Sequence, residues 1–80
     1  MPKVFEINGY IYFFYSNEGN PRERCHIHVR NSGNEAKFWL TPYVSLAESW
    51  GFSGKELNDI EKVVFENKEL IEEKWNEYFR

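Results

Sequence analysis

Short apolar stretches separated by turn residues fill the first half of the chain. Asn8-Gly9 stands between two of them, and this dipeptide is a strong hairpin signal because both turn positions favour positive φ. A polar loop follows at Ser16–Arg24, and a second turn is expected at Asn31–Asn34. The pattern predicts four strands, at Lys3–Ile7, Tyr10–Tyr15, His26–Arg30 and Glu35–Leu40.

The second half of the chain has helical spacing. Ser53–Glu56 fits the S-x-x-E capping box and predicts the start of a long helix. Its apolar stripe is interrupted near Asn67 and Lys68, where we expect a kink or break. One or two helical turns are expected before it, at Tyr43–Trp50, ended by Gly51. The stripe consists of Leu57, Ile60, Val64, Ile71, Trp75 and Tyr78.

These elements predict a single α+β domain over residues 1–80. We expect a four-stranded antiparallel β meander packed against one long C-terminal amphipathic helix, with a short helical segment between them. A small sheet must bury one face, and the helix offers a matching apolar stripe. Alternation along the third and fourth strands predicts which side chains face the helix: Ile27, Val29, Ala36, Phe38 and Leu40.

Composition places this domain in a reducing compartment. Cys25 is the only cysteine, so no intrachain disulfide can form, whereas secreted domains of this size usually depend on disulfides. The longest apolar run, Tyr10–Tyr15, is too short to span a bilayer, and the start of the chain does not resemble a signal peptide. We therefore expect a cytoplasmic protein without membrane attachment, and we expect no cofactor.

The formal net charge of −3 is unevenly distributed. Residues 1–54 hold five acidic and five basic side chains, whereas residues 55–80 hold eight acidic and five basic ones, so the whole excess of −3 lies on the helix. This acidic balance argues against a general nucleic-acid binder but permits a local basic surface on the sheet.

The sheet face opposite the helix, which we expect to be open to solvent, carries the candidate chemistry. If Ile27 and Val29 point inward, the polar residues that alternate with them point the other way, beside those of the fourth strand. The candidate catalytic residues are His26, His28 and Lys37. The candidate binding residues are Arg30, Glu35, Trp39 and, depending on the register of the second strand, Tyr12 or Tyr10.

This combination suits phosphate esters such as RNA. Two histidines can share the acid and base roles, Lys37 and Arg30 can neutralise phosphoryl charge, and Trp39 can stack an unpaired base. The alternative is a solvated polar face without a function. A weaker alternative is a metal site at His26 and His28, which needs further ligands from elsewhere.

Several segments, in this order, resemble one bacterial protein family. They are Val4-Phe5, Gly9-Tyr10, Phe14–Gly19, His26-Ile27-His28-Val29, Ala36-Lys37-Phe38-Trp39-Leu40, Gly51-Phe52-Ser53 and Trp75–Phe79. The chain is similar over nearly its whole length to short proteins of domain-of-unknown-function family 4160. That family often has proline just before the first histidine, where this chain has Arg24-Cys25.

The resemblance implies a setting. Such genes often stand beside one for a protein of domain-of-unknown-function family 2442, and some of these pairs look like toxin–antitoxin modules. It therefore implies a toxin-like component with a small antitoxin-like partner protein, which acts on RNA if the sheet face that carries His26 and His28 is a site. The alternative is a non-enzymatic protein-interaction module, and an exposed edge strand also permits a homodimer.

Overall fold

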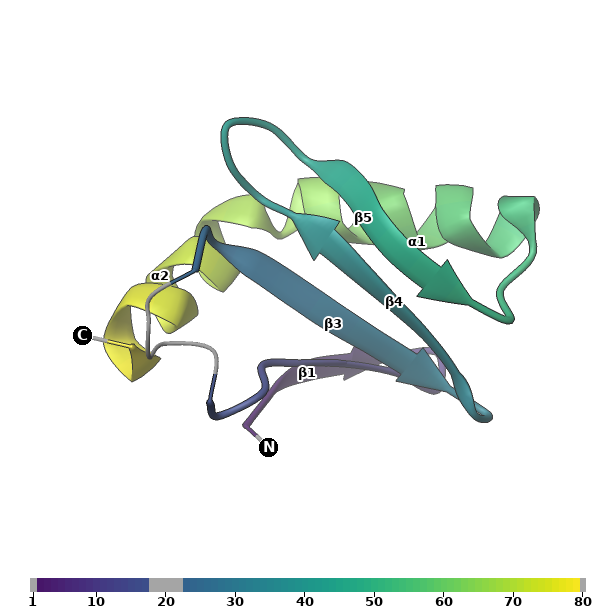
Figure 1. Cartoon of the computed structure of the whole chain (residues 1–80), viewed down its shortest axis with the longest axis horizontal. Helices are drawn as coiled ribbons and strands as arrows, with labels where there is room; N and C mark the ends of the chain where they lie inside the picture. The colour runs from purple at the N-terminus through teal and green to yellow at the C-terminus, as the bar shows by residue number, and fades with distance from the viewer. Residues whose placement is uncertain (1, 18–22, 80) are drawn as a thin grey trace.

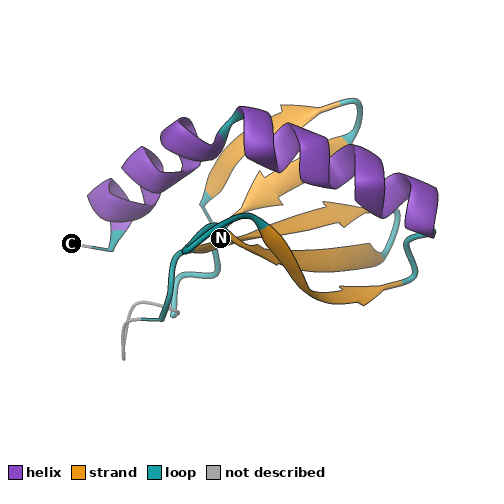
Figure 2. Cartoon of the chain, turned by 90° about the horizontal axis from the view of Figure 1, so that it is seen from above, coloured by secondary structure: helices purple, strands orange, loops and turns teal. Residues whose placement is uncertain are grey.

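A computed structural model of the chain describes residues 2–17 and 23–79. Within these residues five strands come first, and all of them form one antiparallel sheet in the order β1-β2-β3-β4-β5. Two helices follow and lie together on one side of this sheet (Figures 1 and 2). The strands are β1 (Lys3–Ile7), β2 (Tyr10–Phe13), β3 (His26–Asn31), β4 (Asn34–Trp39) and β5 (Ser45–Trp50), and the helices are α1 (Gly54–Glu66) and α2 (Lys68–Tyr78).

The α+β class and the meander of the first four strands are confirmed, with ends that differ by one or two residues. Both turns use residues at positive φ. Asn8 and Gly9 have φ of 53° and 81°, and Ser32 and Gly33 have 50° and 84°. The predicted loop between β2 and β3 is only partly visible, since Gly19 and Pro21 lie outside the described residues.

The prediction of helical turns at Tyr43–Trp50 is wrong. Ser45–Trp50 is a fifth strand that pairs with β4, and a register irregularity falls between Lys37 and Phe38. Leu, Ala and Glu favour a helix in isolation, but here the free edge of β4 supplies a hydrogen-bonding partner that overrides this preference.

The expected single helix is two helices. Ser53 caps α1 through a complete capping box, as its sequence predicts. The chain leaves the helical path at Asn67, whose side-chain Nδ2 donates to the Val63 carbonyl at 2.8 Å. The predicted break near Asn67 and Lys68 is therefore confirmed.

The core lies between the sheet and the helices. All five side chains predicted to face the helix are fully buried there, and the helices contribute Ile60, Val64, Ile71 and Trp75. Tyr78, which was expected in the same stripe, is 45% exposed because the stripe ends before the end of α2. Further core residues are Tyr12, Phe14 and Phe52.

Candidate functional site

The register of β3 and β4 brings the predicted polar residues together on the sheet face away from the helices. His26 lies opposite Trp39, His28 opposite Lys37, and Arg30 opposite Glu35. Since directly opposed residues of an antiparallel pair share a face, six of the seven predicted side chains are neighbours. We refer to this set, His26, His28, Arg30, Glu35, Lys37 and Trp39, as the histidine face.

The histidines themselves are not open to solvent. His26 is 0% exposed and His28 is 6% exposed, which contradicts the expectation of an open face. Aromatic rings account for much of this burial. Ring centroids of Phe13 and Tyr15 lie 5.6 and 4.5 Å from that of His28, and those of Trp39 and Trp75 lie 5.5 and 4.9 Å from that of His26. The two imidazoles contact each other edge to face, 5.1 Å apart.

The tautomer of His26 follows from its hydrogen bond. Its Nδ1 lies 2.8 Å from the backbone carbonyl oxygen of Arg24, which can only accept. Nδ1 therefore carries a proton and donates it, so that in the neutral imidazole the lone pair is on Nε2. This bond ties the start of β3 to the chain segment just before it.

Glu35 links His28 to a tyrosine outside the predicted set. The Tyr15 hydroxyl donates to the Glu35 carboxylate, at 3.0 Å from Oε1 and 2.9 Å from Oε2. His28 Nδ1 lies 3.7 Å from Glu35 Oε2, which is an ion pair when the imidazole is protonated. Glu35 of β4 therefore lies between His28 of β3 and the Tyr15 hydroxyl, which follows the end of β2.

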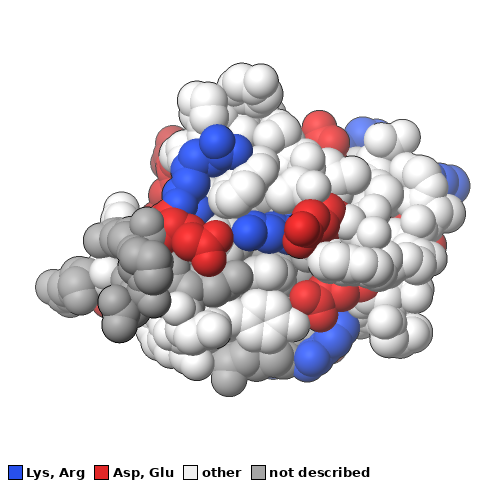
Figure 3. Space-filling model, in the orientation of Figure 1, with Lys and Arg blue, Asp and Glu red and all other residues white. Residues whose placement is uncertain are grey.

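Aromatic or acidic groups accompany each cation on this face. Lys37 Nζ lies 3.4 Å from Glu23 Oε1 and 4.4 Å from the centre of the Trp39 ring. The Arg24 guanidinium stacks over the same ring at 4.0 Å, and that of Arg30 lies 5.2 Å from the Phe13 ring. Figure 3 shows the result on this side of the molecule, where basic and acidic side chains are interspersed and no single sign dominates.

Tyr12 does not belong to the histidine face. It is 1% exposed in the core on the helix side, and burial raises its pKa to about 12. Tyr10, the other expected extension, donates its hydroxyl to Glu56 Oε2 of α1 at 3.0 Å. Because Phe13 is paired with His28, residues of odd number in β2 face the histidines, and those of even number face the helices.

Sequence reasoning missed the residues that contact the histidine face: Phe13, Tyr15, Glu23, Arg24 and Trp75. Phe13 and Tyr15 were detectable in principle, because alternation places them on one face once the register of β2 is known. The contribution of Trp75 was not, since it depends on where α2 meets the start of β3.

No metal centre is evident in the described part of the chain, where no group of three or more His, Cys, Asp or Glu side chains converges. His26 and His28 alone supply two imidazoles. Cys25 packs against the core as a partly buried side chain. Nor does any helix among residues 2–17 and 23–79 have the length and apolar character to cross a membrane.

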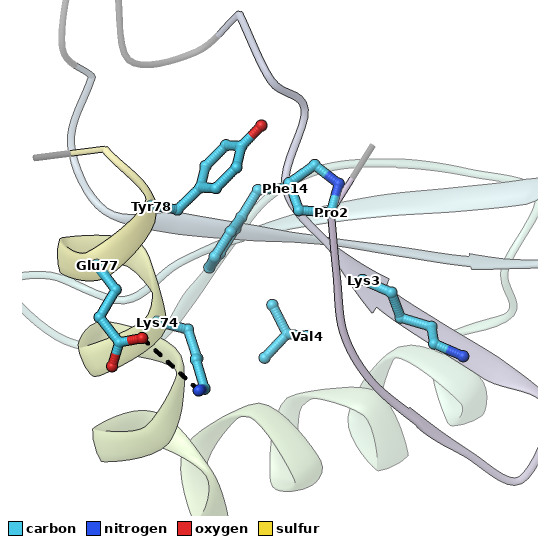
Figure 4. A pocket seen from close by; sticks show the side chains of 7 residues that line it. All are labelled: Pro2, Lys3, Val4, Phe14, Lys74, Glu77 and Tyr78. Atoms are coloured by element: carbon cyan, nitrogen blue, oxygen red, sulfur yellow. Dashed lines mark ion pairs between the residues drawn. The ribbon is translucent and has the colours of Figure 1, made fainter.

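A surface hollow of about 430 Å³ lies away from the histidine face (Figure 4). It is bounded by the first residues of the chain, by Phe14 and by the last turns of α2, where Lys74 and Glu77 form an ion pair at 3.7 Å. None of the predicted site residues lines it. Its lining consists of Pro2, Lys3, Val4, Phe14, Lys74, Glu77 and Tyr78.

The family sequence pattern of domain of unknown function 4160 (DUF4160) matches residues 9–76, from the first turn to the last part of α2. The chain belongs to the DUF4160 family. This match includes both histidines and the whole of β3, β4 and β5. No curated protein and no solved structure matches the chain.

Proposed function

We propose that this chain acts by binding a protein partner and that its two histidines are structural. The burial of both imidazoles carries the proposal, because a general acid or base must reach the atom it protonates or deprotonates. His26 already donates to a backbone carbonyl, and aromatic rings surround both imidazoles.

Exposed apolar side chains favour a binding role. Tyr43, Trp50 and Phe65 are 68%, 57% and 69% exposed, although the domain has few residues with which to build its core. Large apolar groups that remain in solvent are typical of surfaces that meet another protein. The partner expected from the family setting is a small cognate protein, in which case this chain is the partner-bound component of a two-gene toxin–antitoxin-type module.

An RNA-acting toxin is the second candidate. The pairing of His28 with Lys37 and of His26 with Trp39 favours it, because it places an imidazole beside a cation and another beside an indole. The mixed charge of the face is against it, since binding of nucleic acids depends on a surplus of cationic groups. This candidate also requires the histidines to become accessible when substrate binds.

The variant His26→Asn/His28→Asn separates the two candidates. An asparagine places its amide nitrogen near the position of Nδ1, so it keeps a donor for the Arg24 carbonyl but cannot exchange protons near neutral pH. Wild type and variant would be expressed from an inducible promoter and compared for growth inhibition, cleavage of single-stranded RNA and capture of a stoichiometric partner. Circular dichroism would check that both fold.

We expect both proteins to capture the same partner and neither to cleave RNA. Any growth effect of wild type should persist in the folded variant. RNA cleavage by wild type that the folded variant lacks would support the RNA-acting toxin instead. Failure of both proteins to capture a stoichiometric partner would remove the proposal.

A further inference from the structure

The free edge of β5 lies beside a surface groove. Within the described residues β5 is the last strand of the sheet, so one side of its backbone has no strand neighbour (Figure 1). A groove of about 540 Å³ lies between α1 and the segment that leads into β5. We call it the β5 groove, and it is lined by Tyr43, Val44, Asn58, Glu61, Lys62, Phe65 and Glu66.

The β5 groove has apolar walls that the fold leaves in solvent. Tyr43 and Phe65 face it from opposite sides, and they are 68% and 69% exposed. Leu46, which is 43% exposed, is paired with the core residue Phe38 and so lies on the helix side of the sheet. Apolar surface and an unpaired strand edge therefore occur together, which is the arrangement that accepts an added strand.

Charge indicates what kind of segment fits. The α1 wall presents two carboxylates, Glu61 and Glu66, and one ammonium group, Lys62. Both carboxylates lie within residues 55–80, which hold the whole excess of −3. A second copy of this chain would bring its own Glu61 and Glu66 to a symmetric interface, where like charges oppose each other. A basic partner gains attraction at the same place.

We propose that the β5 groove binds an extended segment of a partner protein that carries both apolar and basic residues on the face it turns toward α1. This rests on the proposed function and names its surface. The segment adds a strand to β5 through backbone hydrogen bonds and places an apolar side chain between Tyr43 and Phe65. Its lysine or arginine side chains lie beside Glu61 and Glu66.

A defined peptide tests this site. The probe is a synthetic peptide of about eight residues, long enough to cover one strand. Valine and lysine take turns at every second position, so that both lie on one face of the strand, and threonine fills the positions between. Binding is measured by fluorescence anisotropy of the labelled peptide and by amide chemical shifts of the protein. Three comparisons accompany it: the same peptide N-methylated on alternate backbone amides, a version with glutamate for lysine, and the protein variant Tyr43→Ala/Phe65→Ala. Tyr78→Ala, which removes an exposed aromatic side chain from α2, is the matched control.

We expect shifts at Ser45–Trp50 and along the α1 wall. The variant Tyr43→Ala/Phe65→Ala should weaken binding about tenfold or more, because two aromatic contacts are lost, whereas Tyr78→Ala should not change it. N-methylation should abolish binding, and glutamate for lysine should weaken it. Equal binding by the N-methylated peptide or by the groove variant would overturn the proposal, as would shifts confined to another surface.

Two further outcomes distinguish failure of the β5 groove from failure of the proposed partner-binding function. A partner captured equally well by wild type and by Tyr43→Ala/Phe65→Ala leaves the proposed function standing and refutes the β5 groove as its site. A concentration-dependent dimer of the protein alone, dissociated by the same variant in sedimentation, assigns the groove to a second copy and overturns the basic partner.

Discussion

His26 combines three features that are typical of a structural residue and not of a catalytic one. Its side chain is fully buried, its Nδ1 donates to the Arg24 carbonyl, and its ring lies against Trp39, Trp75 and His28. Buried polar groups with a satisfied hydrogen bond contribute to the stability of a fold, because removing one leaves its partner unsatisfied. At the scale of single residues, the histidine face resembles a second, smaller core on the far side of the sheet.

This arrangement predicts a stability cost at His26. His26→Ala should lower the free energy of unfolding by about 2–4 kcal/mol, since it opens a cavity among aromatic rings and leaves the Arg24 carbonyl without its donor. His26→Asn should recover part of this loss. Urea unfolding followed by circular dichroism measures both. An alanine variant as stable as wild type would show that the ring contacts and the hydrogen bond of His26 do not stabilise the fold.

A second residue-scale prediction compares two glycines at nearly equal backbone angles. Gly51 and Gly33 have φ of 87° and 84°, so alanine is strained at both by roughly 1–2 kcal/mol. A Cβ on Gly51 would collide with the side chain of Asn34, whereas one on Gly33 meets nothing within 4 Å. Gly51→Ala should therefore be less stable than Gly33→Ala by about 1 kcal/mol or more, measured by urea unfolding. Equal losses would mean that Asn34 moves aside freely.

Sequence patterns predicted the direction of the site residues but not their burial. Period-two alternation placed His26 and His28 on the face away from the helices, and the register of β3 with β4 confirms that placement. Exposure depends instead on what covers that face. The covering groups come from β2, from the segment before β3 and from α2, and no local pattern around the histidines encodes them.

Among the elements, β5 shows where local preference fails. Its sequence Ser-Leu-Ala-Glu-Ser-Trp contains good helix formers, and its alternation of small and large residues extends over only six positions. The capping box at Ser53 and the Asn8-Gly9 turn could be predicted from the sequence, because each depends only on residues a few positions apart. A strand whose existence depends on pairing with β4 needs tertiary information that propensity lacks.

The start of α1 is joined to the sheet through one carboxylate. Ser53 donates its backbone N–H to Glu56 Oε1 at 3.0 Å, and Tyr10 of β2 donates its hydroxyl to Oε2 at 3.0 Å. These two hydrogen bonds, in that order of importance, lower the pKa of Glu56. The same contact raises the pKa of Tyr10. Glu56 therefore connects the helix cap with the core-facing side of β2.

A pH dependence follows from this lowered pKa. Because the folded pKa of Glu56 lies below its ordinary value of 4.5, its contribution is complete above that value and disappears as the pH falls through the folded pKa. Glu56→Gln keeps an acceptor for the Ser53 N–H but does not titrate. The stability advantage of wild type over Glu56→Gln should therefore shrink on acidification. Thermal unfolding at a series of pH values measures it, and parallel profiles for the two proteins would contradict the assignment.

At the scale of the whole molecule, both faces of the sheet are largely covered, whereas its edge at β5 is not. The helices cover one face, and the aromatic and histidine cluster fills much of the other. β3 is therefore central in two senses, since it has a strand on each side and buried side chains on both faces. In the part of the chain that the structure describes, β5 has a strand on one side only, and every second side chain along it is exposed. Stability should fall from the centre of the sheet to this edge.

Hydrogen exchange can measure this gradient. In the protein alone, amides of β3 should exchange only through global unfolding, whereas the outward-facing amides of β5 should exchange faster, because they lie at a free edge of the sheet. Protection is measured by NMR at several protein concentrations. Protection of β5 equal to that of β3 would show that something already covers the edge. If that protection rises with protein concentration, the cover is a second copy of the chain. If β5 instead exchanges fast in the protein alone and becomes protected on addition of the peptide of valine and lysine, the edge is a docking strand for a partner.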